Sequence, residues 1–236
     1  IESWLDTKRI DFLAFNDHMP SMLRKIEAGQ SLARFVERTA LTTEQFIALT
    51  KKLSDRKGEV KPAIERLSRR ALDSGIPMAS HDDETSEQRA FFNKIGCKIA
   101  EFPETEEAIN EAGRLQNNII LGAPNIIRGG SHMGASGLSA TDNIKKGLGN
   151  ILCSDYYYPS LINAPAELAK KEIMDFPTAW DMISKNAAYA ANLFDRGEIV
   201  EGKRADLVLL DSIGPRYSML VATLVAGNVA YQSRYV

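Results

Sequence analysis

The chain has 236 residues, with 29 Lys and Arg against 31 Asp and Glu and a formal net charge of −2. This balance gives no reason to expect nucleic acid or an anionic membrane as a partner. The sequence shows no signal peptide and no apolar run long enough to span a bilayer, so we expect a cytoplasmic protein. Its two cysteines, Cys97 and Cys153, lie in strand-like runs, which favours buried reduced thiols over a disulfide. The sequence leaves open whether identical chains associate.

Short apolar strands alternate with helical segments along most of the chain. Alternation of this kind predicts parallel pairing with right-handed crossovers, and therefore an α/β fold. Thr105, followed by Glu106 and Glu107, is typical of a helix start, because a hydroxyl caps the first turn and acidic groups suit its positive end. The predicted strands cover residues 10–15, 76–81, 97–102, 118–121 and 150–154, and the predicted helices cover residues 20–39, 43–55, 59–74, 86–95, 105 onward and 141–148.

The last part of the chain changes character. Residues 159–171 and 177–189 have helical spacing, with prolines at or near the helix starts, where a missing N–H costs nothing. Residues 197–199, 205–210 and 218–231 are predicted as short strands joined by tight turns. We therefore expect an α/β portion over residues 1–192 and a small β appendage over residues 193–236.

All three histidines and one aspartate lie in short polar motifs that follow strands. His18, His81 and Asp155 come just after the first, second and fifth predicted strands, and His132 lies a few residues beyond the fourth. In a parallel α/β barrel the carboxyl ends of the strands meet at one mouth. Neutral imidazole and ionised carboxylate are ligands of divalent metals, zinc among them. The sequence thus predicts that His18, His81 and Asp155 bind one or two divalent ions, with zinc the expected metal.

Two further groups of polar residues accompany these motifs. Asp17, Asp82 and Asp83 are candidates to orient a ligand imidazole or a bound water, although carboxylates at such positions also occur simply as solvated loop residues. A glycine-rich segment with an arginine favours binding of an anion, because glycine amides approach phosphate oxygens and a guanidinium binds them in a bidentate manner. A plain surface loop is the alternative. The candidate phosphate-binding residues are Asn125, Arg128, Gly129, Gly130, Ser131 and His132.

Residues 197–211, GEIVEGKRADLVLLD, resemble the C-terminal signature of the amidohydrolase superfamily. The motifs DHMP (17–20), ASHDDET (79–85), AEFP (100–103), GAPNIIRGGSH (122–132) and SDY (154–156) are similar to its branch of phosphonate-metabolism diphosphatases. The resemblance implies a metal-dependent (β/α)8 TIM-like barrel, of which about five strands are present, with a composite β-sandwich. It also implies that Asp155 is both a metal ligand and the general base. We expect the N-terminal part of such a barrel, with its first-strand and bridging ligands, to lie outside this chain.

The activity implied by the resemblance is release of pyrophosphate from α-D-ribose 1-methylphosphonate 5-triphosphate, a small phosphorylated substrate. Two alternatives stay open. One is hydrolysis of a cyclic amide or amine, the commonest chemistry of the wider superfamily, although an amide ring offers no anionic oxygens to the Arg128 segment. The other is a non-catalytic fragment or ligand-binding module.

Overall fold

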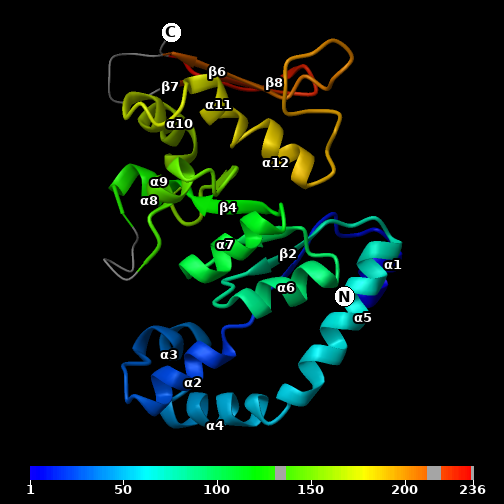
Figure 1. Cartoon of the computed structure of the whole chain (residues 1–236), viewed down its shortest axis with the longest axis vertical. Helices are drawn as coiled ribbons and strands as arrows, with labels where there is room; N and C mark the ends of the chain where they lie inside the picture. Colours follow the sequence, from blue (N-terminus) through cyan, green and yellow to red (C-terminus); the bar gives the residue numbers. More distant parts are fainter. Residues whose placement is uncertain (131–136, 212–218, 235–236) are drawn as a thin grey trace.

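Five short parallel strands form the centre of the molecule (Figure 1). The computed structural model describes residues 1–130, 137–211 and 219–234. Each strand pairs with the strand that precedes it in the chain, and helices connect them. This sequential parallel order is the arrangement of a (β/α) barrel, which confirms the predicted partial barrel. The strands are β1 (Leu13–Phe15), β2 (Met78–His81), β3 (Ile99–Glu101), β4 (Asn118–Gly122) and β5 (Ile151–Cys153).

Two apolar clusters hold helices against this sheet. One cluster packs β1 and β2 against α1, α5 and α6, and includes Leu5 and Met78. The other packs β3, β4 and β5 against the helices that follow them, and includes Ile109, Ile126 and Leu168. The strands are thus covered by helices, as barrel strands are. The helices that flank the sheet are α1 (Glu2–Asp6), α5 (Val60–Asp73), α6 (Ser86–Lys94), α7 (Glu106–Arg114), α8 (Ala123–Arg128), α9 (Ala140–Lys145) and α10 (Ser160–Lys170).

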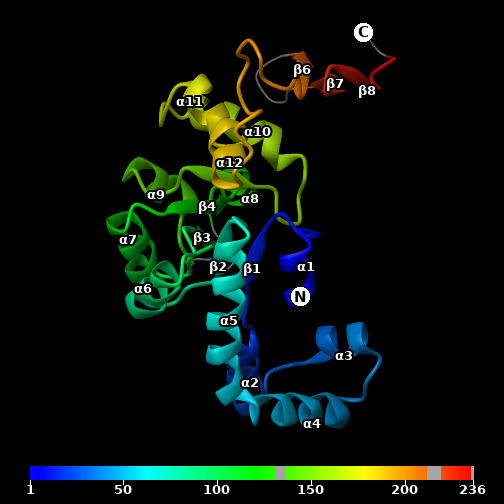
Figure 2. The ribbon, with the colours of Figure 1, turned by 90° about the vertical axis from the view of Figure 1, so that its right-hand side faces the viewer.

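A helical arm separates β1 from β2 in the chain. It contains α2 (Met19–Glu27), α3 (Ala33–Thr39), α4 (Thr43–Ser54) and the short 3₁₀ helix η1 (Lys57–Glu59). Figures 1 and 2 show the arm extending from the sheet on the side opposite the C-terminal strands. A single helix over residues 20–39 was expected, and this prediction is wrong, because the chain leaves the helical conformation between α2 and α3.

The outer edge of β5 is bonded to the segment where one helix ends and the next begins. A continuous helix over residues 177–189 was expected, but α11 (Phe176–Asp181) and α12 (Lys185–Ala190) are separate, and Ser184 between them has φ −128° and ψ −90°. The break leaves the Met182 carbonyl free to accept a hydrogen bond from the Leu152 N–H at 3.0 Å. The Asn186 amide donates to the Asn150 carbonyl at 2.9 Å. These bonds satisfy the Leu152 N–H and the Asn150 carbonyl at the edge of the sheet. In a continuous helix the Met182 carbonyl would be bonded within the helix instead.

A second, antiparallel sheet follows the α/β portion, as predicted. It contains β6 (Leu207–Asp211), β7 (Met219–Val225) and β8 (Asn228–Gln232), in that order. The expected strand at residues 197–199 is wrong: those residues form no strand, and Ile199 is 89% exposed. Instead, this segment is fixed to α12 by polar contacts, since Glu198 accepts hydrogen bonds from Tyr189 and Lys203 and pairs with Lys185 at 3.1 Å.

These contacts hold the pKa of Glu198 at about 2, chiefly through the Lys203 hydrogen bond and then those of Tyr189 and Lys185. Because the folded pKa lies below the ordinary value of 4.5, the stabilisation is complete above pH 4.5 and is lost as the pH falls toward 2. We expect Glu198→Gln to lower the urea midpoint near neutral pH, and the difference from the unmodified protein to shrink between these limits. Glu201→Gln, at an exposed position of the same segment, is the control. A difference independent of pH would contradict this assignment.

Cys97 and Cys153 are both free, as predicted, and burial raises the pKa of Cys97 to about 12. None of the helices in the described ranges has the length and apolar character needed to cross a membrane.

Candidate active site

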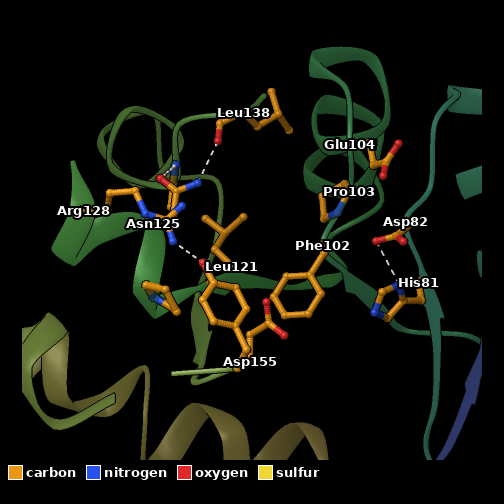
Figure 3. A pocket seen from close by; sticks show the side chains of 14 residues that line it. His81, Asp82, Phe102, Pro103, Glu104, Leu121, Asn125, Arg128, Leu138 and Asp155 are labelled. Carbon is orange, nitrogen blue, oxygen red and sulfur yellow. Dashed lines mark hydrogen bonds and ion pairs between the residues drawn. The ribbon is translucent and has the colours of Figure 1, made fainter. Parts of the chain in front are cut away.

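A pocket of about 270 Å³ opens where β2, β3, β4 and β5 end. Its walls include His81, Phe102, Arg128 and Asp155, and each comes from a different segment of the chain. Figure 3 shows Arg128 and His81 on opposite sides, with Phe102 and Asp155 between them. Residues that are far apart in sequence therefore meet at one edge of the sheet, as a barrel fold requires.

His81 is the last residue of β2, and its environment favours a positive charge. Its Nδ1 lies 2.9 Å from Oδ1 of Asp82. Within the described ranges this contact is an ion pair, and Nδ1 makes no hydrogen bond. Asp82 first, and Glu101 and Asp155 more weakly, raise the pKa of His81 against the opposing effect of burial.

His18 lies beside His81 on the other side of the same carboxylate. Its Nδ1 is 3.6 Å from Oδ2 of Asp82, and the two imidazole rings meet edge to face with centroids 5.9 Å apart. The His18 side chain is 62% exposed. A histidine that binds a metal through one ring nitrogen generally has its other nitrogen against a carboxylate or carbonyl. Asp82 occupies that position for both imidazoles and leaves each Nε2 for another ligand.

Glu101 belongs to the same site, although the sequence reasoning did not select it. Parallel pairing places Glu101 directly beside His81 in register, and its Oε2 lies 4.0 Å from Nε2 of His81. Burial raises the pKa of Glu101, with His81 acting in the opposite direction. A carboxylate at the end of a strand next to the His81 strand was the available signal in the sequence. Glu104, on the following loop, also has a raised pKa, chiefly through burial.

The imidazoles and carboxylates of the site are of the types that bind a divalent metal. In the described ranges, however, their ligand atoms do not converge on a single position. Two imidazoles, with the carboxylates of Glu101 and Asp155, are the nitrogen and oxygen ligands that zinc takes. Nδ1 of His81 is buried and has no aligned hydrogen bond within the described ranges. No group of three or more His, Cys, Asp or Glu in those ranges has the arrangement of a metal site. The structure therefore brings His18 to His81 and places Asp155 in the same pocket, without closing a ligand set.

Asp82 is the one carboxylate of the three expected beside the histidines that contacts them. Asp17 instead accepts a hydrogen bond from the Met19 N–H at 2.9 Å, at the start of α2. Asp83 pairs with Arg89 at 3.0 Å on the helix-covered side of the sheet. Their expected role beside a ligand imidazole is not seen in these contacts.

The segment expected to form a phosphate-binding loop is partly helical. Residues 123–128 form α8, which ends at Gly129 with φ +81°. The N–H groups of Gly129 and Gly130 both donate to the Asn125 carbonyl at 3.0 Å, so in this structure they bond to the helix end, and their contact with an anion stays a prediction. Asn125 itself is bound through its side chain to Leu138 and Ala140. Ser131 and His132 lie outside the described residues.

Arg128 nevertheless reaches the pocket from the last turn of α8. Its guanidinium donates a hydrogen bond to the Tyr156 hydroxyl, and its Cζ lies 5.9 Å from the centre of the Tyr156 ring. No carboxylate in the described parts of the chain pairs with Arg128. The pocket thus has acidic and imidazole groups on one side and an uncompensated cation on the other.

Three residues that line the pocket have left-handed backbone conformations. They are Asp82, with φ +58°, Phe102, with φ +52°, and Asp155, with φ +47°. Each lies one or two residues after a strand. Left-handed conformations are costly for residues other than glycine, and they cluster at functional sites. The Phe102 ring, placed by such a turn, meets the His81 ring edge to face with centroids 5.4 Å apart.

The fold resembles that of solved amidohydrolase structures. Enamidase, described as a member of the amidohydrolase superfamily, has a TM-score of 0.53 and 14% identity, over 73% of this chain and 52% of that one. An adenosine deaminase from Xanthomonas campestris with bound zinc has a TM-score of 0.52 and 17% identity, over 73% of this chain and 49% of that one. These likenesses concern the fold.

The sequence relative is more specific. The chain is 47% identical over 136 residues to the alpha-D-ribose 1-methylphosphonate 5-triphosphate diphosphatase of Escherichia coli (strain K12). The match covers 57% of this chain and 35% of the relative, so the chain spans about a third of the relative's length. No model of a known protein family matches the chain. The resemblance to the amidohydrolase superfamily, and to this diphosphatase in particular, is confirmed.

Proposed function

We propose that the protein containing this chain is a metal-dependent hydrolase that releases pyrophosphate from α-D-ribose 1-methylphosphonate 5-triphosphate. The observation that carries the proposal is the two-sided pocket, in which His81, Asp82 and Asp155 lie opposite Arg128, a cation that pairs with no carboxylate in the described ranges. Nitrogen and oxygen donors suit a metal, while a guanidinium suits a phosphate. The 47% identity to the Escherichia coli diphosphatase supports this particular substrate. The proposal places the barrel portion at residues 1–192 and the sandwich portion at residues 193–236.

His18, His81 and Asp155 are the proposed metal ligands, and Glu101 joins them as the carboxylate in register with His81. A divalent metal at such a site acts as a Lewis acid and makes water more acidic. Asp82 lies against the Nδ1 side of both imidazoles, which would leave each Nε2 to bind the metal. Asp155 takes the proton of the attacking water, since a carboxylate in the pocket can serve as general base.

Arg128 is the proposed partner of the polyphosphate. Its planar guanidinium can bind two phosphate oxygens at once. Tyr156, which accepts a hydrogen bond from Arg128, restrains the side chain on the pocket side. Phosphate contacts then supply substrate binding, while the histidine side of the pocket supplies the chemistry. This division predicts that binding and turnover respond to different substitutions.

The direct test is product analysis with the complete natural protein. It is incubated with the methylphosphonate ribose triphosphate, with a nucleoside triphosphate and with dihydroorotate, and the products are separated by ion-exchange chromatography. We expect pyrophosphate from the first compound and no opening of the dihydroorotate ring. Ring opening without release of pyrophosphate would assign the protein to cyclic-amide hydrolysis and would overturn the proposal.

His81→Ala is expected to remove metal and activity together, because it deletes one of a small number of ligands. Metal content is measured by elemental analysis on folded protein, with circular dichroism as the check of folding. Glu87→Gln, at an exposed position of α6, is the control and should retain its metal. Unchanged metal content in folded His81→Ala protein would show that His81 is not a ligand.

Arg128→Lys is expected to raise KM for the triphosphate by about tenfold or more, because an ammonium cannot make the bidentate contact of a guanidinium even though the charge is kept. Metal content should not change. Arg114→Lys, at an exposed position of α7, is the matched control. Unchanged KM and kcat in Arg128→Lys would mean that Arg128 does not bind the substrate.

A further inference from the structure

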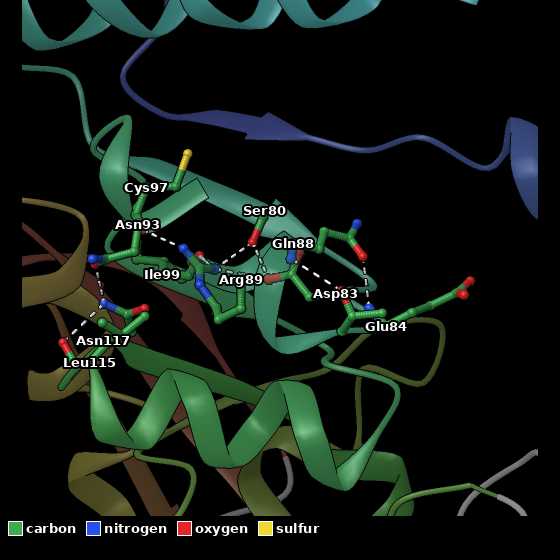
Figure 4. Close-up of polar contacts among 11 residues, drawn as sticks. Ser80, Asp83, Glu84, Gln88, Arg89, Asn93, Cys97, Ile99, Leu115 and Asn117 are labelled. Atoms are coloured by element: carbon green, nitrogen blue, oxygen red, sulfur yellow. Dashed lines mark hydrogen bonds and ion pairs between the residues drawn. The ribbon is translucent and has the colours of Figure 1, made fainter. Parts of the chain in front are cut away.

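Behind the pocket, a buried arginine connects three segments of the sheet. Arg89, on α6, has no exposed surface, and its Nη1 donates to Oγ of Ser80 at 2.5 Å and to Oδ2 of Asp83 at 3.0 Å. Its Nη2 donates to the Cys97 carbonyl at 2.6 Å, and its Nη1 also reaches the Ile99 carbonyl at 3.3 Å. Ser80 donates to the same Asp83 oxygen at 2.5 Å (Figure 4). One side chain thus joins the end of β2, the following turn and the start of β3.

This network is a costly way to gain stability. Asp83 is 1% exposed, and burial raises its pKa and lowers that of Arg89, against their mutual attraction. Asp83 Oδ1 and Arg89 Nε have no hydrogen-bond partner in the described parts of the chain. A buried ion pair with unsatisfied atoms is often no more stable than apolar side chains of similar volume. Its contribution is therefore better sought in the geometry that it imposes.

The network holds the residues on either side of the His81–Asp82 pair. Successive side chains of a strand point to opposite faces, so Ser80 faces α6 while His81 faces the pocket. The left-handed turn at Asp82, with φ +58°, then returns the chain so that Asp83 again reaches Arg89. Arg89 therefore bonds to Ser80, which precedes His81, and to Asp83, which follows Asp82. The His81–Asp82 pair lies between these two anchored residues.

Backbone hydrogen bonds extend this restraint to the neighbouring loop. The Asp82 N–H donates to the Glu101 carbonyl at 3.0 Å, and the Glu104 N–H donates to the Asp83 carbonyl at 3.0 Å. The loop between Glu101 and Glu104 carries Phe102, whose ring packs edge to face on His81. A shift of Asp83 would therefore move both the carboxylate and the aromatic ring that contact the His81 imidazole.

We propose that Arg89 is a positioning residue, which acts through Ser80 and Asp83 to fix the Asp82 carboxylate against the His81 and His18 imidazoles. The proposal rests on the metal site proposed above. It predicts that the network can be replaced by apolar side chains with the fold retained, but with loss of order in the turn after β2. Loss of such an orienting partner lowers metal affinity by about 10- to 100-fold.

The test compares the complete natural protein with the double variant Asp83→Leu/Arg89→Met, in which neither charge remains. Hydrogen exchange of the Asp82 and Glu104 amides is followed by NMR, with the amides of β4 as reference, and Zn²⁺ affinity is measured by competition with a chromogenic chelator. We expect exchange at the two amides to be at least tenfold faster and the Zn²⁺ dissociation constant to rise by about 10- to 100-fold. Leu168→Ala, a cavity variant in the core cluster that contains β4, should change neither the exchange of the Asp82 and Glu104 amides nor the Zn²⁺ affinity.

Unchanged exchange and unchanged Zn²⁺ affinity in the folded double variant would overturn the proposal. Ser80→Ala, which keeps the ion pair and removes only the hydroxyl, provides the same two measurements if the double variant does not fold, with smaller changes expected in the same direction. If the unsubstituted protein binds no Zn²⁺, the proposed metal site fails, and the exchange rates alone decide whether Arg89 fixes the turn.

Discussion

Asp155→Asn is expected to lower kcat for release of pyrophosphate by about 10²- to 10⁴-fold, the contribution of a positioned general base. KM should change much less, because binding of the triphosphate depends mainly on the contacts of Arg128 with phosphate. The amide keeps the shape of the carboxylate and loses its basicity. Asn also tolerates the left-handed conformation that Asp155 adopts, with φ +47°, so the backbone of the pocket should be preserved.

The comparison is made by coupled assay of pyrophosphate in the complete natural protein, with metal content measured on the same samples. Asp142→Asn, on the exposed surface of α9, is the matched control and should leave kcat unchanged. A loss of activity fully explained by loss of metal would make Asp155 a ligand without a role as base. Full activity with full metal content would remove Asp155 from the mechanism.

Asp83→Ala is expected to lower the free energy of unfolding by about 3–5 kcal/mol, because it leaves the Arg89 guanidinium buried without a counter-charge. Arg89 has no exposed surface and cannot turn to solvent without disturbing α6. The loss is measured by urea denaturation followed by circular dichroism. Glu59→Ala, which breaks the exposed pair of Arg56 and Glu59, is the control and should leave the midpoint nearly unchanged.

The double variant Asp83→Leu/Arg89→Met should recover most of the stability lost in Asp83→Ala, since neither charge is then buried. This non-additivity separates a buried ion pair from two independent packing contributions. If Asp83→Ala and the double variant were equally destabilised, the cost would come from packing rather than from the uncompensated charge.

The parallel sheet was predictable because its strands carry short apolar runs between clear helix signals. The strand predicted at residues 150–154 contains β5, and Thr105 caps α7 through its side chain, as its hydroxyl and the following acidic residues indicated. The antiparallel sheet was also predicted, from short strand-like runs joined by Gly-Lys and Gly-Asn turns. Each of these features is encoded by residues that are close together in the chain, so it can be recognised in a single sequence.

Predictions failed where tertiary contacts decide the local structure. The break between α11 and α12 has no proline or glycine to mark it, and it follows from the strand edge that Met182 and Asn186 satisfy. Helix α8 was not predicted, although Pro124 at its second position is a usual sign of a helix start. Residues 197–199 were predicted as a short strand that leads into a tight turn, but no strand in the described ranges pairs with them.

For the candidate site, the ends of the strands could be predicted from the sequence, but the direction of each side chain could not. His18, His81 and Asp82 came together as a group because adjacent parallel strands end side by side. Simple strand alternation would place Asp83 on the same side as His81, and the left-handed turn at Asp82 places it on the side of Arg89 instead. Glu101 was overlooked because its relation to His81 depends on register, and register is a property of the paired strands.

The left-handed turns at Asp82, Phe102 and Asp155 have a consequence for protein engineering. A redesign that scored each position for folding free energy would choose glycine at all three, since glycine alone adopts this conformation without a side-chain penalty. That redesign would delete two carboxylates and the aromatic ring against His81. At this edge of the sheet, the substitutions that would stabilise the fold are therefore the ones that would remove the functional side chains of the pocket.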